Sequence, residues 1–192
     1  MTSNPDSSVV GKHILRVIGG TPRALNFKEP TKGTPLRVDA FEQRPWEGVT
    51  TYATVGLSSF PMYQNGKEFP VRPELIASAY GTNDEVSFLL SETAFHVMKS
   101  GWMCSPGSVL RDVVKKVGIS STLEHVYFNS PFLWDGGFGS TQISGTTVAW
   151  LMLVPISNSE YLFYKQNGPD SLEERFGAAE IDIFNLGRKS VI

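Results

Sequence analysis

The sequence predicts an α+β fold in which a mixed, largely antiparallel β-sheet packs against helices. Three strand-like segments, Leu36–Phe41, Val49–Ser58 and Glu74–Tyr80, follow one another before the main helical segment. A regular parallel α/β array would instead alternate its strands with helices. The segment Glu85–Ser100 then carries apolar residues over a broad face, as a well-buried helix does.

The chain is expected to form one domain over residues 1–192. Its 192 residues are enough to bury a sizeable core, and 41% of them are hydrophobic. No internal repeat, linker or low-complexity tract divides the sequence. Residues 1–8 are expected to be flexible, because they are polar and lie at the terminus.

Further strands are predicted from apolar alternation and from turn residues. The segment Thr146–Val154 is apolar on both faces, which predicts a central strand covered on both sides. Asn65-Gly66 predicts a hairpin turn, because both residues tolerate a positive φ. Strands are also expected over Arg23–Phe27 and Leu123–Phe128, and Glu180–Phe184 is a last short alternating segment.

The helices are predicted from apolar residues at helical spacing, and the residues at their termini set their ends. The first should end at Ile18, and a short one is expected over Ser108–Val117. Ser157-Asn-Ser-Glu160 is a capping box that begins another helix. Gly168-Pro169 should end that helix and begin the next, which reaches about Phe176.

The composition argues against several classes of function. A formal net charge of −2 does not supply the basic face that a non-specific nucleic-acid binder needs. Cys104 is the single cysteine, so no internal disulfide forms and a reducing compartment is expected. The longest apolar run, Val148–Ile156, has nine residues, whereas a membrane helix needs about 20. The N-terminus also lacks the apolar core of a signal peptide. We therefore expect a cytoplasmic protein without direct contact to membrane or nucleic acid.

Few residues suggest catalysis or metal binding. Cys104 with His13, His96 or His125 would make a nucleophile–base pair, but a small, partly buried thiol explains this cysteine better. One cysteine and three scattered histidines give no paired metal-ligand spacing. The glycines around Gly136 do not follow phosphate-loop spacing. We predict no catalytic residue, cofactor or metal, and a small Cys/His hydrolase is the least favoured alternative.

Aromatic and acidic residues on loops are the better candidates for contact with a partner. The turn before Val49 carries Trp46 and Glu47, and a long connection over Ser130–Ser140 carries further aromatic residues. In that connection Phe132 is expected to plug the core. The six predicted partner-binding residues are Trp46, Glu47, Tyr63, Trp134, Asp135 and Phe138.

Six segments carry a family resemblance through their order and spacing, over most of the chain after residue 45. They are EGVTTYATVGLSSFPM (Glu47–Met62), RPELIASAY (Arg72–Tyr80), FLLSETAFHVMKSGWMCSPGSVLRDVV (Phe88–Val114), HVYFNSPFLWDG (His125–Gly136), TVAWLMLVPISNSE (Thr147–Glu160) and EIDIFNLGRKSVI (Glu180–Ile192). Together they resemble the suppressor-of-fused domain family, and within it the small bacterial members of the antitoxin or immunity-protein type.

The resemblance implies a cytoplasmic inhibitor that binds a cognate toxin, often a nuclease, with fixed stoichiometry and neutralises it. Acidic residues suit such an inhibitor, because complementary charge steers association with a basic nuclease. The acidic candidates are Glu42, Glu47, Asp135, Glu173 and Glu174. A regulatory or scaffold module that binds a peptide at an exposed sheet edge is the alternative. A homodimer is compatible with each of these functions.

Overall fold

The computed structural model describes residues 5–192. Its helices are α1 (Pro5–Ile18), α2 (Glu85–Ser100), α3 (Val113–Val117) and α4 (Asn158–Ala178), with a 3₁₀ turn at Leu57–Ser59. Its strands are β1 (Arg23–Lys28), β2 (Pro35–Glu42), β3 (Val49–Val55), β4 (Tyr63–Gln64), β5 (Lys67–Glu68), β6 (Val71–Tyr80), β7 (Val109–Leu110), β8 (His125–Asn129), β9 (Thr141–Ile143) and β10 (Thr146–Ile156). The segment expected to be flexible falls partly on residues 1–4, which lie outside the described residues, and Pro5–Ser8 belong to α1.

The largest sheet has eight strands. Seven of them follow the order β1-β2-β3-β6-β10-β8-β7, and β9 pairs with the first residues of β10. Strands β6 and β10 are parallel, with Val71 opposite Thr147 and Ile76 opposite Met152. The other pairs in this sheet are antiparallel. The predicted α+β fold with a largely antiparallel sheet is confirmed, and β10 is the central strand that its apolar sequence predicted.

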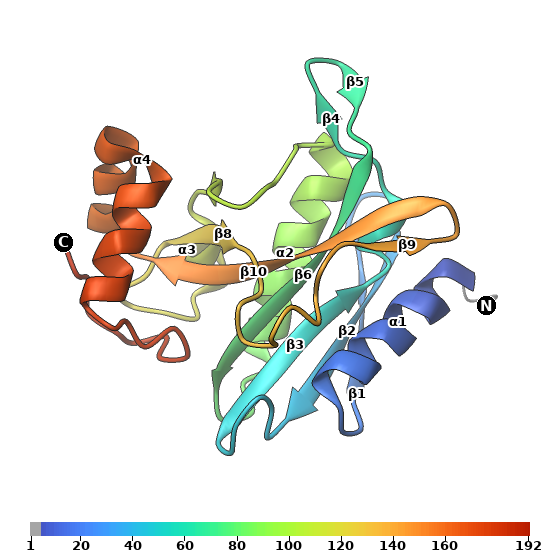
Figure 1. Cartoon of the computed structure of the whole chain (residues 1–192), viewed down its shortest axis with the longest axis horizontal. Coiled ribbons are helices and arrows are strands. Elements are labelled where there is room, and N and C mark those ends of the chain that lie inside the picture. The colour runs from blue at the N-terminus through green and yellow to red at the C-terminus, as the bar shows by residue number, and fades with distance from the viewer. Residues whose placement is uncertain (1–4) are drawn as a thin grey trace.

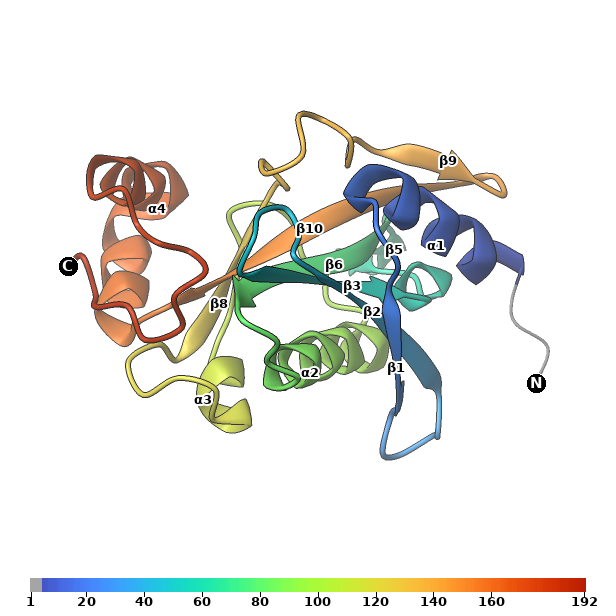
Figure 2. The same cartoon turned by 90° about the horizontal axis from the view of Figure 1, so that it is seen from below.

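Helices cover both faces of this sheet (Figure 1). Figure 2 shows α2 and α3 on one side of the sheet and α1 on the other. On the α2 side, Leu90 and Val97 share a fully buried cluster with Tyr52. On the α1 side, Ile14 packs in a second cluster with Phe41. Among the described residues, no helix is long and apolar enough to cross a membrane.

The predicted helix over Ser108–Val117 is wrong in its first half. Val109–Leu110 form β7, which pairs with β8, and only Val113–Val117 are helical. Asp112 separates the two elements with a left-handed φ of 61°. A right-handed helix cannot continue through that conformation.

Two tight turns build hairpins through residues with positive φ. Asn65 and Gly66, with φ of 52° and 75°, join β4 to β5, which confirms the predicted turn. Ser144 and Gly145, with φ of 49° and 82°, join β9 to β10. The sequence does not predict β9, because three residues are too short to show alternation.

Glu74 is a fully buried carboxylate in β6. It accepts four hydrogen bonds, from Thr54 Oγ1 at 2.6 Å, from the N–H of Gly56 at 2.9 Å, and from the N–H and hydroxyl of Ser58 at 3.1 and 2.7 Å. These bonds hold the 3₁₀ turn after β3, so the strand predicted to reach Ser58 stops at Val55. Burial of the carboxylate raises the pKa of Glu74, although the four donors act in the opposite direction.

Helix α4 consists of two helical segments. Gly168 has non-helical backbone angles, with φ of 85° and ψ of 173°, and Pro169 begins the second segment. The predicted break at Gly168-Pro169 is confirmed. The predicted capping box is also confirmed, because Ser157 Oγ accepts the N–H of Glu160 at 3.1 Å and Glu160 Oε2 accepts the N–H of Ser157 at 2.8 Å.

A buried ion pair holds the chain that follows α4. Arg188 is 7% exposed, and its Nη1 and Nη2 lie 2.6 and 2.9 Å from the two carboxylate oxygens of fully buried Glu160. Arg188 Nη2 also donates to the carbonyl of Pro155 at 3.0 Å, and the N–H of Val191 donates to Glu160 Oε1 at 3.2 Å. One carboxylate therefore caps α4 and fixes the C-terminal segment.

Replacement of Arg188 by methionine is expected to lower the free energy of unfolding by about 3–5 kcal/mol, because Glu160 then stays buried without its partner. Urea denaturation measures this change. Lys189→Met removes a neighbouring exposed charge and should change stability by less than about 0.5 kcal/mol. A loss below about 1 kcal/mol in Arg188→Met contradicts the assigned role of the pair.

The raised pKa of Glu74 predicts a pH dependence of stability. The unfolded chain releases this proton near the ordinary pKa of 4.5, whereas the folded protein holds it to higher pH. The contribution of Glu74 to the free energy of unfolding is therefore fully present below pH 4.5 and falls as the pH rises above it, by up to about 1.4 kcal/mol per pH unit, until the folded pKa is passed.

Urea denaturation at several pH values compares the wild type with Glu74→Gln and with the exposed control Glu174→Gln. The control should follow the wild-type profile, and Glu74→Gln should lack the decrease. Parallel profiles for all three proteins would show that Glu74 does not hold its proton in the folded state.

Candidate functional site

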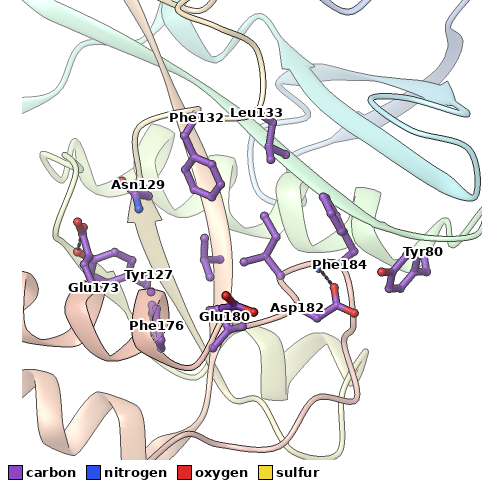
Figure 3. A pocket seen from close by; sticks show the side chains of 14 residues that line it. Tyr80, Tyr127, Asn129, Phe132, Leu133, Glu173, Phe176, Glu180, Asp182 and Phe184 are labelled. Carbon is purple, nitrogen blue, oxygen red and sulfur yellow. Dashed lines mark hydrogen bonds between the residues drawn. The ribbon is translucent and has the colours of Figure 1, made fainter.

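A cavity of about 540 Å³ opens between α4, the chain after it and the loop that follows β8. Figure 3 shows the side chains of Tyr127, Phe132, Phe176 and Phe184 around it. The apolar residues that line the cavity are Phe132, Leu133, Val154, Phe176, Ile181, Ile183 and Phe184. We call this cavity, together with the aromatic residues Trp46, Tyr80, Phe132 and Phe184 at its rim, the aromatic cleft.

The rim of the aromatic cleft exposes large aromatic side chains. Trp46, Tyr80 and Phe132 are 54%, 53% and 56% exposed. The Phe184 ring lies edge-on to Trp46 and to Tyr80, with centroid distances of 5.4 and 5.7 Å. Clustered exposed aromatic side chains are typical of protein contact surfaces, because they bury much area at a low cost in side-chain entropy.

Hydrogen bonds within the segment Glu180–Phe184, and one to the end of β6, shape one wall of the cleft. Glu180 has a left-handed φ of 47° and turns the chain away from α4. Asp182 Oδ1 accepts the N–H of Phe184 at 3.1 Å, and the carbonyl of Phe184 accepts the N–H of Tyr80 at 3.2 Å. The alternation predicted over Glu180–Phe184 places Ile181 and Ile183 among the lining residues without forming a strand.

The charge of the cleft has one sign. The carboxylates of Glu173, Glu180 and Asp182 line it, and no lysine or arginine is among its described lining residues. Tyr127 donates its hydroxyl to Glu173 Oε1 at 2.5 Å. Burial raises the pKa of Tyr127, and the bond to Glu173 raises it further, so the phenol stays protonated. Of the acidic residues selected from the sequence, only Glu173 lines the cleft.

The structure brings Trp46 of the predicted contact set to the cleft. Glu47 is exposed beside Trp46 in the turn that leads into β3. Tyr63 is 48% exposed, but it lies on β4, beyond the Val71 end of β6, whereas Trp46 precedes Val49, which pairs with Tyr80 at the other end. The two predicted aromatic contacts Trp46 and Tyr63 therefore do not share a surface.

The loop after β8 reverses two expectations. Phe138, predicted to contact a partner, is only 4% exposed and packs against Trp134 and Trp150 at centroid distances of 5.2 and 5.5 Å. Phe132, expected to plug the core, is instead 56% exposed at the cleft. Trp134 is half-buried and Asp135 is exposed. Phe138 is thus a core residue of the α1 side.

Sequence reasoning missed Tyr80, Phe184 and the two isoleucines of the cleft. The signal was present in the alternation of acidic and apolar residues over Glu180–Phe184. That alternation gives the segment an apolar side, and a segment without a strand partner must cover that side against another element or present it to solvent.

Comparison with known families gives an extended match. The family model described as "Suppressor of fused protein (SUFU)" matches residues 32–189. This chain belongs to the suppressor of fused family. The resemblance found in the sequence is confirmed, and every residue of the aromatic cleft lies within the matched range.

Similar proteins cover nearly the whole of this SUFU family member. It is 29% identical over 187 residues to immunity protein YqcF of Bacillus subtilis (strain 168), and the match covers 97% of each chain. A crystal structure of a putative SUFU homologue from Neisseria gonorrhoeae FA 1090 superposes with a TM-score of 0.72 and 18% identity, over 97% of this chain and 96% of that one. A chain of the Sufu–Fu complex gives 0.71 and 12%, over 99% and 93%. These structures support the SUFU fold.

The described residues of this SUFU family member do not form the Cys–His pair of a hydrolase. Cys104 is 3% exposed, and its Sγ contacts Met62 Sδ at 3.6 Å. His125 Nδ1 accepts the N–H of Asp112 at 2.9 Å. Burial raises the pKa of Cys104 to about 12, so little of the nucleophilic thiolate is present at neutral pH.

Asp112, Glu124 and His125 place three potential metal ligands within 4.8 Å of one another. The ligand atoms of His125 and Glu124 are already engaged, and the Asp112 side chain is 58% exposed. His125 Nδ1 accepts a backbone N–H, and Glu124 Oε2 pairs with Lys115 Nζ at 3.0 Å. Hydrogen bonds from Asp112 and Lys115 to His125 and Glu124 bring these residues together, and exposed acidic groups are common without a metal ion.

Cys104 is expected to react very slowly with the thiol reagent DTNB in the folded protein. A pKa of about 12 in place of 9.0 lowers the thiolate fraction roughly a thousandfold at neutral pH, and burial restricts access. The release of the coloured thiolate measures the rate, and the urea-unfolded chain is the control that should react as a free cysteine. A fast reaction of the folded protein would reopen the hydrolase hypothesis.

Proposed function

We propose that this protein is a cytoplasmic immunity protein that neutralises a cognate nuclease toxin by stoichiometric binding. The observation that carries this proposal is the similarity to immunity protein YqcF, which extends over 97% of both chains. The match therefore extends over nearly the whole chain and is not confined to one motif. The similar Sufu–Fu structure is described as a complex, which is consistent with a SUFU fold that binds a partner.

The site geometry supports binding as the mode of action. The aromatic cleft offers exposed rings beside an apolar cavity, which is the chemistry of a binding hot spot. Its carboxylates suit a basic partner such as a nuclease, whose active site must hold a polyanion. We therefore propose the main contact at the aromatic cleft, with Trp46 at its rim and Glu47 next to Trp46 in the chain, and keep Tyr63, Trp134 and Asp135 as predicted outer contacts.

Coexpression with the toxin encoded by the neighbouring gene tests the proposal. The wild type should restore growth and should elute with the toxin as one complex of fixed stoichiometry in size-exclusion chromatography with light scattering. The same measurement on the free protein tests for a homodimer. If the toxin still kills and no complex forms, the proposed function fails.

Trp46→Ala and Phe132→Ala are each expected to weaken toxin binding by about 2 kcal/mol, roughly thirtyfold, because both rings are exposed in the free protein. Isothermal titration calorimetry measures the loss. Leu162→Ala is a matched control, since Leu162 is 50% exposed on α4 and does not line the cleft. Unchanged affinity in both aromatic variants would place the contact elsewhere.

A second candidate function is peptide binding by strand addition at β1. This edge strand has β2 as its partner in the sheet order, and its side chains are exposed or half-buried. Phe27 of β1 and the 51% exposed Phe88 of α2 lie edge-on at 5.4 Å beside this edge. Phe88→Ala in the same calorimetric series separates the two surfaces, because it should weaken binding only if the partner adds to β1.

A further inference from the structure

The aromatic cleft combines features that select one kind of occupant. Its volume of about 540 Å³ falls within the range of binding pockets and its walls are apolar, so it takes up a large hydrophobic group. Three carboxylates surround that apolar surface, and the described lining residues include no basic side chain to neutralise them. A net charge of −2 for the whole chain conceals this local concentration.

The carboxylates of Glu173 and Glu180 retain oxygen atoms for a ligand. Glu173 Oε1 accepts the Tyr127 hydroxyl, and Asp182 Oδ1 accepts the N–H of Phe184. The bond from Tyr127 leaves the second oxygen of Glu173 without a partner among the described residues, whereas the Tyr80 side chain also hydrogen-bonds the Asp182 carboxylate. Glu180 is exposed on the left-handed turn between α4 and the wall segment, and it forms no ion pair with a described residue.

The exposed rings favour the same charge. Trp46, Tyr80 and Phe132 each expose more than half of their surface, so part of each side chain is accessible to a ligand. Aromatic faces attract ammonium and guanidinium groups, and lysine and arginine pack their aliphatic stems on apolar surface while their charged ends stay in water. A cation at the rim therefore gains from the rings and from the carboxylates together.

We propose that the aromatic cleft binds a protein segment in which an aromatic or long aliphatic side chain is flanked by lysine or arginine. The apolar side chain enters the cavity, and the flanking cations pair with Glu173, Glu180 and Asp182. The identity of the partner as the toxin rests on the proposed function, whereas the chemistry of the segment follows from the cleft itself. A phosphate-bearing ligand is excluded by the like charge of the carboxylates.

Two synthetic peptides test the chemistry without the toxin. The probe is the N-acetylated, C-amidated pentapeptide GKWKG, and its twin GEWEG carries the opposite charge. Titration followed by two-dimensional NMR should show GKWKG shifting the amide signals of Ile181, Ile183 and Phe184, with an affinity at least tenfold above that of GEWEG. Equal affinity for the twin, signals that shift elsewhere, or no binding of either peptide overturns the proposal.

Neutralising the three carboxylates should remove this preference. Each partly exposed ion pair changes affinity roughly two- to fivefold, so Glu173→Gln, Glu180→Gln and Asp182→Asn combined should weaken GKWKG binding about tenfold. The amides keep an acceptor for Tyr127 and Phe184, so the cleft should stay folded. The control combines Glu85→Gln, Asp170→Asn and Glu174→Gln, which are exposed, lie outside the cleft and change the net charge equally. Equal binding by both triple variants overturns the proposal.

Toxin binding by the same variants distinguishes a failure of the cleft chemistry from a failure of the immunity function. If the wild type neutralises the toxin and the cleft variant binds the toxin as tightly as the control variant does, the cleft chemistry fails and the immunity function stands. If the wild type does not bind the toxin but GKWKG occupies the cleft as expected, the immunity function fails and the cleft chemistry stands. When both hold, raising the salt concentration should weaken the wild-type complex more than that of the cleft variant.

Discussion

The buried contact between Glu160 and Arg188 is the constraint on which the candidate site depends. The segment that forms one wall of the aromatic cleft leaves the C-terminal end of α4 and runs to Arg188, which pairs with Glu160 in the first turn of the same helix. Desolvation of two charges offsets much of their attraction, and an apolar pair of similar size is often as stable. The ion pair contributes geometric specificity, because a bidentate contact fixes both the distance and the orientation of the two side chains, whereas apolar contacts fix neither.

Glu74 plays a corresponding part at the other end of the sheet. Its four hydrogen bonds stop β3 and fix the 3₁₀ turn. Strand β6, which carries Glu74, ends at Tyr80, whose N–H holds Phe184 in the rim of the cleft. The cleft is therefore built on the rigid centre of the sheet and not on loops alone, although most of its aromatic residues lie on connections. This arrangement presents exposed rings in one geometry before a partner arrives, which reduces the entropy lost on binding.

Local signals in the sequence predicted most of the fold, and contacts between distant residues account for what they missed. The capping box at Ser157 and the Asn65-Gly66 turn each depend on residues that are close in the sequence, and the structure has both. The loop after β8 depends on a distant contact, because His13 Nε2 lies 3.2 Å from the carbonyl oxygen of Gly137, which is 124 residues away in the sequence. That contact with α1 helps to decide that Phe138 turns inward while Phe132 does not. No spacing rule connects Glu160 with Arg188, so the position of the cleft wall could not be predicted from the sequence either.

The parallel pairing of β6 with β10 has a consequence for the timing of synthesis. Val71 and Thr147 are neighbours in the sheet but far apart in the chain, so β6 lacks one of its two partners until most of the protein has left the ribosome. The cleft is completed later still, when Arg188 reaches Glu160. A nascent chain that stalls between these points can build the sheet while lacking the partner surface. Under the proposed immunity function, translation through Arg188 would mark the moment at which the protein can bind its toxin.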